Sequence, residues 1–372
     1  HPVAHSFPTR RSSDLTVRRI TRGKARTADA TFPVVTPAFL DAHSHIGMRR
    51  SGEPADEGES NEQMDSILAL VDALDSVQMD DASFGDAIEM GVLYSCVVPG
   101  SGNIIGGRSA VVRHYAGDSS AALVGRAGLK AALGYNPMST RSWKGARPFT
   151  RMGGLALLRE KLDAVKQKTA QLRKARGRRR QELALSAEER VLAEVLKGKE
   201  RLRVHCHKID DIATLLRLVD AFKLKVTVEH AADVHDGGIL KALAERDIPV
   251  VYGPVDAFPY KVELKHETWR NVKLVMESGC RYGLMTDHPV TLAKSLLLQT
   301  RHFLRCGLDK QQAVELVSRQ NAEILGVDKI LGTLEKGKWA SFVCWNGDPF
   351  DLAHHPVCVY GEGEEVYAAP DA

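Results

Sequence analysis

The sequence predicts an α/β fold, a (β/α)8 or TIM barrel joined to a small β subdomain, and three observations carry this prediction. The chain has 372 residues, which suits one large α/β domain with a small partner, because α/β barrels run to about 250 residues. Short apolar runs alternate with helix-like stretches along most of the chain. Polar residues that can bind metal stand directly after several of these runs.

The apolar runs are the predicted strands. Uninterrupted runs rich in β-branched residues are typical of strands buried on both faces, as in a parallel sheet. A weak third strand is expected at 110–114, and the clear ones cover residues 34–40, 93–98, 129–133, 202–204, 226–228, 248–252 and 282–285.

The stretches between them have apolar residues at three- and four-residue spacing, which indicates amphipathic helices. Alternation of strands and helices on this scale implies parallel strands with right-handed crossovers, and about eight units close a barrel. Predicted helices cover residues 66–74, 154–170, 209–222, 238–246 and 266–277.

Two segments depart from this pattern. Residues 166–180 hold eight basic residues and no acidic one, and Ser186 follows as a predicted helix N-cap. A solvated helical hairpin on the barrel exterior is favoured over a nucleic-acid site, because the run has no aromatic residue to stack on bases. Past residue 330, short apolar runs with glycine turns predict the small β subdomain.

The composition bounds the class of protein. Hydrophobic residues make up 44% and charged residues 26% of the chain, with a formal net charge of +4, so we expect a globular core and no nucleic-acid partner. No uncharged apolar run reaches about 18 residues, so no membrane span is expected. The six cysteines form no CxxC pair, which favours reduced thiols and a cytoplasmic location over a disulfide framework.

Metal-competent side chains follow the predicted strands. His43 and His45 form an HxH pair after the first run, and residues two apart in a strand point to the same side. His205 and His207 repeat this pattern after the run at 202–204, while His230 and Asp287 follow two later runs. Since barrel active sites are assembled at the carboxyl ends of the strands, we expect these side chains to meet in one metal centre.

These residues resemble the amidohydrolase superfamily of metal-dependent hydrolases, whose barrel carries HxH on strand 1, His on strands 5 and 6, and Asp on strand 8. The resemblance covers about residues 37–350 and is nearest to imidazolonepropionase-like and prolidase-like members, especially a subgroup with the segments PGSGNIIGG and VHCHKIDDI. Carried over position by position, it implies the metal ligands His43, His45, His205, His230 and Asp287.

The chemistry that this ligand set allows is hydrolysis. Neutral imidazoles and a carboxylate bind a divalent ion, most simply Zn²⁺, with Mn, Fe or Co as alternatives, and such an ion lowers the pKa of bound water from 15.7 to about 7. Asp287 is the candidate catalytic residue, because it can take a proton from that water and return it to the leaving amine.

Whether one ion or two are bound is left open. In binuclear relatives a carboxylated lysine or a glutamate bridges the ions, and Lys130 is the candidate here, with a lysine that merely snorkels from a barrel strand as the equal alternative. The subgroup tends to have an acidic residue where Tyr135 stands. If that carboxylate is the bridge, its loss leaves a mononuclear site.

Four further residues are candidate substrate contacts. His207 faces the same side as His205, so it is a candidate metal ligand or substrate contact, and a role in supporting a ligand is favoured. The glycine-rich segment after the second strand lacks both the P-loop ending and the dinucleotide spacing, so we interpret it as a substrate-lining loop with Ser101, Asn103 and Arg108.

We therefore expect an enzyme that hydrolyses a C–N bond, in an amide or cyclic amide, of a small-molecule substrate. Deamination of a heterocycle on the same metal site is the alternative, and a catalytically inactive barrel scaffold is a third reading that the complete ligand set disfavours. A homo-oligomer is compatible with the sequence.

Four segments are expected along the chain. Residues 5–15, HSFPTRRSSDL, resemble a translated sequencing adapter, so residues 1–15 are expected to be non-native. Residues 16–35 are the expected remnant of an N-terminal β subdomain, 36–330 the barrel and 331–372 the C-terminal β subdomain. Because the family builds one β-sandwich from both ends of the chain, we expect an incomplete sandwich.

Overall fold

The structure, a computed structural model, describes residues 15–19, 30–257 and 261–370. Residues 1–14 lie outside the described residues, and with them nearly all of the segment expected to be non-native. Among the described residues, none of the helices combines the length and the apolar character that crossing a bilayer requires.

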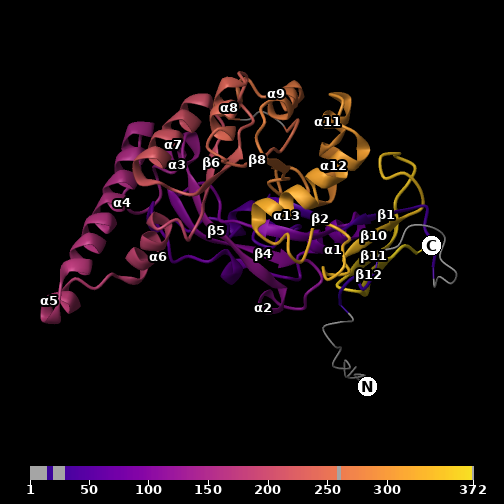
Figure 1. Cartoon of the computed structure of the whole chain (residues 1–372), viewed down its shortest axis with the longest axis horizontal. Helices are drawn as coiled ribbons and strands as arrows, with labels where there is room; N and C mark the ends of the chain where they lie inside the picture. Colours follow the sequence, from indigo (N-terminus) through magenta and orange to yellow (C-terminus); the bar gives the residue numbers. More distant parts are fainter. Residues whose placement is uncertain (1–14, 20–29, 258–260, 371–372) are drawn as a thin grey trace.

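An eight-stranded sheet forms the body of the molecule and confirms the predicted barrel (Figure 1). Nearly all of its positions are buried, as expected for strands covered on both faces. In sheet order its strands are β2 (Phe39–Ser44), β3 (Val92–Val97), β4 (Ile105–Arg113), β5 (Leu123–Ala132), β6 (Leu202–Cys206), β7 (Val226–His230), β8 (Val250–Tyr252) and β9 (Tyr282–Leu284).

The third barrel strand, β4, departs from the expected parallel arrangement. It runs antiparallel to both β3 and β5, and it is longer than the weak strand expected at 110–114. The connection from β3 spans only residues 98–104, whereas a parallel crossover needs a dozen residues or more. The short link therefore forces a hairpin.

The segment 66–74, predicted as a helix, instead forms two isolated β-bridges to β4, at Ile67 and Asp72, with a turn between them. Its backbone bonds to β4, from Leu68 N to Ile105 O at 2.9 Å and from Arg108 N to Val71 O at 2.7 Å. Only η3 (Ala73–Ser76), a single 3-10 turn, follows. The helical spacing of its apolar residues was misleading, because this segment packs and pairs along the edge of β4.

Contacts from side chains close the barrel between β2 and β9. The Asn321 amide donates to Leu40 O at 2.6 Å and to Leu284 O at 2.8 Å, one carbonyl on each strand. Asp41 Oδ1 accepts from Thr286 N at 3.0 Å, and Asp287 N donates to His43 O at 3.0 Å. The end of β9 is thereby fixed against the HxH strand.

Helices cover the barrel, and one pair projects from it. Helices α4 and α6 pack together and reach away from the barrel, with α5 at their tip (Figure 1). A capping box at Ser186 and Glu189 starts α6, as the N-cap prediction required. The helices are α1 (Ala82–Glu89), α2 (Ser119–Ala122), α3 (Tyr135–Ser139), α4 (Arg151–Lys174), α5 (Gly177–Glu182), α6 (Ala187–Leu196), α7 (Ile209–Phe222), α8 (Gly238–Ala244), α9 (Val272–Glu277), α10 (Leu296–Gln299), α11 (Arg301–Arg305), α12 (Lys310–Leu316) and α13 (Arg319–Leu325), with 3-10 turns η2 (Ala55–Glu57), η4 (Val262–Leu264), η5 (Trp269–Asn271) and η6 (Ala293–Ser295).

A separate antiparallel sheet of four strands completes the fold. Its order is β1 (Val34–Pro37), β10 (Phe342–Trp345), β11 (Pro356–Gly361) and β12 (Glu364–Ala368). The apolar run at 34–40 is therefore two strands in two sheets, which part at Ala38, where the backbone N donates to Ser341 O. Thr16 bridges to Trp339 beside this sheet.

Candidate functional site

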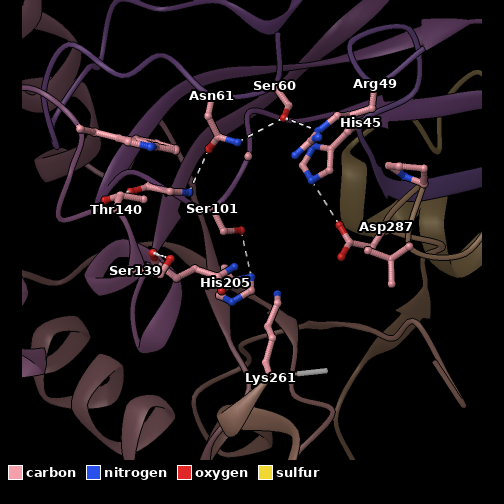
Figure 2. A pocket seen from close by; sticks show the side chains of 16 residues that line it. His45, Arg49, Ser60, Asn61, Ser101, Ser139, Thr140, His205, Lys261 and Asp287 are labelled. Carbon is pink, nitrogen blue, oxygen red and sulfur yellow. Dashed lines mark hydrogen bonds and ion pairs between the residues drawn. The ribbon is translucent and has the colours of Figure 1, made fainter. Parts of the chain in front are cut away.

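The candidate site lies where the barrel strands end and their loops begin. A cavity of about 500 Å³ opens there, and His45, His205 and Asp287 are among its lining residues. Figure 2 shows His45 and Asp287 facing each other on one side of the cavity, with Ser101 and His205 on another. The five residues predicted as metal ligands all come from the ends of β2, β6, β7 and β9, so the structure brings them together.

His43 is oriented by a buried ion pair that the sequence reasoning missed. Its Nδ1 donates to Glu229 Oε2 at 2.8 Å, and Arg203 Nη2 donates to the same oxygen at 3.0 Å. All three side chains are fully buried. Although burial favours the neutral carboxyl, the Arg203 charge and the bonds from His43 and Thr227 lower the pKa of Glu229 to about 2. Because the ionised carboxylate holds Nδ1–H, the Nε2 lone pair of His43 faces the site.

His45 and His230 are fixed in the same way by backbone carbonyls. His45 Nδ1 donates to Val98 O at 2.7 Å, and His230 Nδ1 donates to Gly253 O at 2.9 Å. A carbonyl oxygen can only accept, so Nδ1 carries the proton in each ring. Both imidazoles therefore present the Nε2 atom, the one available as a metal ligand.

His205 is held through a chain of polar contacts. Its Nδ1 lies 3.0 Å from Ser101 Oγ, and Lys130 Nζ donates to that hydroxyl at 3.0 Å and to Pro99 O at 2.9 Å. Lys130 is fully buried, and burial lowers the pKa of its ammonium to about 8. The candidate bridging lysine thus donates two hydrogen bonds to the loop that follows β3.

The Asp287 carboxylate faces two of these imidazoles. Its Oδ1 lies 3.2 Å from His45 Nε2 and 3.6 Å from His43 Nε2. Lone pairs on both sides of such contacts repel unless a cation lies between them. Ligands at about 2.1 Å from a tetrahedral ion are about 3.4 Å from each other, so this spacing fits a divalent metal.

The electrostatics of the cluster suit metal binding. Burial lowers the pKa of His43 to about 4 and holds the pKa values of His205 and His230 well below their usual range. Burial also acts on Asp287, but the neighbouring imidazoles hold its pKa well below the ordinary value. At neutral pH His43, His205 and His230 are therefore neutral and Asp287 is ionised, the protonation states that a divalent ion requires.

Two of the ligands have strained backbones. His230 has φ +80° and Asp287 has φ +52°, values that residues with a side chain seldom adopt. Strain of this kind persists where the surrounding structure over-determines it, and it gathers at functional sites. Here the positive φ values turn the side chains of His230 and Asp287 from the ends of β7 and β9 toward the same group of candidate ligand atoms.

The predicted substrate contacts separate in the structure. Ser101 lines the cavity, and His207 is buried among the other imidazoles, 4.6 Å from the His230 ring. Asn103 is buried in loop packing, donating to Glu62 O and accepting from Arg147. Arg108 is exposed on β4, and its backbone lies opposite Leu129 of β5 in the sheet. Neither Asn103 nor Arg108 is among the described residues that line the cavity. The Asn103 side chain is used within the loop, and Arg108 stands on β4 rather than in the loop.

Glu263 is a further residue of the site that the sequence reasoning missed. It lies in η4, after β8, and its carboxylate reaches His205 and accepts from the backbone N of Tyr135 at 3.0 Å. The sequence gives no strand-end signal for it, because the loop that carries it has no periodicity. For Glu229, Arg203 and Lys130 a signal exists, since charges stand inside runs that are otherwise apolar.

Comparisons with known proteins identify the family and agree with the fold. Residues 174–366 match the family described as Amidohydrolase family. The crystal structure of an amidohydrolase from Thermotoga maritima MSB8 is 31% identical, with a TM-score of 0.88 over 96% of this chain and 94% of that chain.

Matches at lower sequence identity say less about this chain. Amidohydrolase tasK of Hapsidospora irregularis is 24% identical over 366 residues, which are 92% of this chain but only 37% of that protein. The chain thus spans little more than a third of the length of this curated relative. A prolidase solved with N-methylphosphonate-L-proline, 14% identical with a TM-score of 0.54 over 95% of this chain and 91% of that one, shows the fold alone.

Proposed function

Because the chain belongs to the amidohydrolase family, we propose that it hydrolyses the C–N bond of an amide or cyclic amide in a small molecule, using a divalent ion, most simply Zn²⁺. The observation that supports this most directly is the common orientation of the histidines. His43, His45 and His230 are each anchored through Nδ1, and all present Nε2 to the Asp287 side of the site.

The donor set fits a divalent ion. Among the described residues, the buried Nε2 atoms of His43 and His230 have no hydrogen-bond partner, and leaving such atoms unpaired costs about 1–3 kcal/mol each. A metal bound by His43, His45, His205, His230 and Asp287 would satisfy them. Imidazole nitrogens with one carboxylate are a donor set typical of Zn²⁺.

Asp287 carries the proposed proton transfers. A divalent ion held here would supply a Lewis acid that polarises the scissile carbonyl and makes water acidic enough to react near neutral pH. The ionised Asp287, whose side chain is 12% exposed at the cavity, takes the proton of the attacking water and then donates it to the leaving nitrogen. Glu229 and Arg203 keep His43 in one tautomer throughout.

The cavity favours an anionic substrate. Arg49 and Lys261 line it, and Asp287 is the one acidic residue among the lining residues that are described. Figure 2 shows the two cations on opposite sides of the opening, Arg49 beside His45 and Lys261 beside His205. A small amide that carries a carboxylate, such as an N-acyl amino acid or a dipeptide, would place its charge on one of them while its amide meets Asp287.

Metal analysis of the purified protein tests the proposal. We expect at least one Zn²⁺ per chain after removal with a chelator and reloading, and a loss of that ion in His230→Ala. His355→Ala removes an exposed histidine and serves as the matched control. Wild-type protein that binds less than one ion, with no change in His230→Ala, would show that the centre is not a metal site.

A substrate screen separates hydrolysis of amides from deamination. N-acyl amino acids, dipeptides and ring amides are assayed beside aminopurines, and both the released acid and ammonia are measured. Turnover of aminopurines alone would assign the metal-dependent chemistry to deamination. A protein that binds metal and turns over none of these compounds would favour the scaffold reading.

A further inference from the structure

A separate group of metal-competent side chains lies outside the histidine cluster, on the loops that follow β7 and β8. Asp233 and His235 come from the loop between β7 and α8, and His266 follows η4. One ligand atom from each of the three lies within 4.8 Å of the other two. The group shares no residue with the proposed catalytic centre, and none of its members is among the described residues that line the cavity.

Asp233 is the buried member of the group, with a side chain that is 1% exposed. Its Oδ1 accepts from the backbone N of His266, and its Oδ2 lies 3.3 Å from His266 Nδ1. A buried carboxylate is costly unless cations or hydrogen-bond donors surround it. Lys208 Nζ supplies a cation 3.3 Å from Oδ2, and the 27% exposure of this lysine side chain leaves it able to move into water.

The two histidines place their rings side by side above this carboxylate. His235 Nδ1 donates to Asp233 O at 3.0 Å, and because the carbonyl can only accept, the ring keeps its lone pair on Nε2. The His266 ring is 4.0 Å from the His235 ring between centroids, and its side chain is 39% exposed. Both imidazoles are therefore open to solvent and close enough to bind one ion together with Asp233.

Asn271 fixes the backbone that carries the group. Its side-chain amide donates to His266 O at 2.9 Å and to Ala232 O at 3.4 Å, one carbonyl on each of the two loops. Asn271 is buried, and the bond from His266 N to Asp233 joins the loops a second time. Ligands whose backbones are already held in place lose less conformational entropy when they bind.

We propose that Asp233, His235 and His266 form a surface site for a divalent transition metal such as Zn²⁺, which links the loop after β7 to the loop after β8. The 3.3 Å between Asp233 Oδ2 and His266 Nδ1 matches the edge of about 3.4 Å around a tetrahedral ion. Rotation of the exposed His235 ring brings in the third ligand, and water can take the fourth position. The ion replaces the Lys208 ammonium at Oδ2.

This site would act on the cavity through η4. Lys261, which lines the cavity (Figure 2), directly precedes that turn, and His266 follows it by two residues. Glu263, within the turn, reaches His205. An ion bound at His266 therefore restrains the segment that forms this wall of the cavity, and we expect the backbone amides of residues 261–267 to exchange hydrogen more slowly when zinc is bound.

Zinc titration of the full chain tests the site. Protein carrying the metal that survives desalting is titrated with further Zn²⁺ by calorimetry, as wild type, His235→Ala, His266→Ala and His355→Ala. His355 is an exposed histidine ahead of β11 and provides the matched control. We expect one further ion in wild type and His355→Ala. Because even groups that only support a ligand contribute about 10- to 100-fold in metal affinity, each ligand variant should lose at least that much.

Lys208→Ala provides a readout that a purely structural cluster would not move. It removes the cation that competes for Asp233 Oδ2, so zinc should bind up to about five-fold more tightly, the upper range for partly exposed ion pairs. Hydrogen exchange at 261–267 should slow with zinc in wild type and stay unchanged in His235→Ala.

The outcomes separate this site from the catalytic centre. Wild type that takes up no further ion, or one that binds equally well to His235→Ala and His266→Ala, would overturn the surface site. Unchanged exchange at 261–267 in zinc-bound wild type would overturn its link to the cavity wall. The metal that survives desalting should be lost in His230→Ala and kept in His235→Ala, so a failure of the proposed function is seen independently.

Discussion

Replacing Glu229 with glutamine should both destabilise the protein and weaken its metal centre. In the folded chain the Glu229 carboxylate accepts from His43 Nδ1 and Arg203 Nη2, and all three groups are fully buried. Glutamine has nearly the same shape but carries no charge. The amide oxygen of glutamine can still accept from Arg203, which also donates to Ala42 O, but the buried Arg203 cation loses the negative charge that balances it.

The size of the effect follows from two independent estimates. Removing one partner of a buried ion pair costs about 3–5 kcal/mol. The pKa of Glu229 is about 2 in place of the ordinary 4.5, and this difference corresponds to about 3 kcal/mol of favourable interaction with the ionised carboxylate. A carboxylate that orients a metal-binding histidine contributes a further 10- to 100-fold in metal affinity, by general experience with such groups.

Urea unfolding of metal-free protein at pH 7 measures the first effect, and zinc titration measures the second. Glu335→Gln changes an exposed glutamate paired with Lys338 and should shift stability by less than about 1 kcal/mol. If Glu229→Gln unfolds within about 0.5 kcal/mol of wild type and binds zinc equally well, the buried pair does not support His43 in the way described.

The remaining predictions address other parts of the molecule. Asp287→Asn should lower kcat by about 10²- to 10⁴-fold on any substrate found, with an unchanged rate counting against its role. Gly134→Ala, whose Cβ would lie 2.8 Å from Asp211 Oδ2 at a backbone φ of +84°, should destabilise the chain by about 1–3 kcal/mol in urea unfolding. On α4, Leu162→Ala should cost about 2–5 kcal/mol in urea unfolding, whereas Lys161→Ala should cost less than about 1. Burial raises the pKa of Glu267 from 4.5 to about 7 in the folded chain. Between these two pH values the unfolded chain has lost the proton while the folded chain keeps it, so the free energy of unfolding falls as the pH rises. Glu267→Gln should make this fall less steep in urea unfolding measured across that range.

Strand-end histidines could be predicted because their geometry is local. His43 and His45 follow an apolar run at a spacing of two, and His230 and Asp287 end runs of their own. Once the fold is a barrel, the carboxyl ends of all parallel strands meet, so the sequence positions alone bring these side chains together. No information on loops is needed for that step.

The hairpin between β3 and β4 shows where such reasoning fails. Apolar runs and helical spacing carry no strand direction, and the segment 66–74 had the spacing of a helix while it pairs with β4. The direction of β4 depends on the length of the link at 98–104, which is too short for a crossover. Because β4 already begins at Ile105, Arg108 is an exposed strand residue and not part of the loop that lines the cavity.

Glu263 could not be found from the sequence, since a loop residue reaches the site only through tertiary packing. The buried charges of the strands are different. Lys130, Arg203 and Glu229 each interrupt a run that the fold buries on both faces, and a charge there must find a partner inside the barrel. Neighbouring parallel strands supply it: Arg203 and Glu229 lie on β6 and β7, which pair in register. A charge inside an apolar barrel strand, one or two residues before a strand-end histidine, therefore predicts an ion pair beneath the metal centre, and Arg203 before His205 with Glu229 before His230 already marks that layer in the sequence.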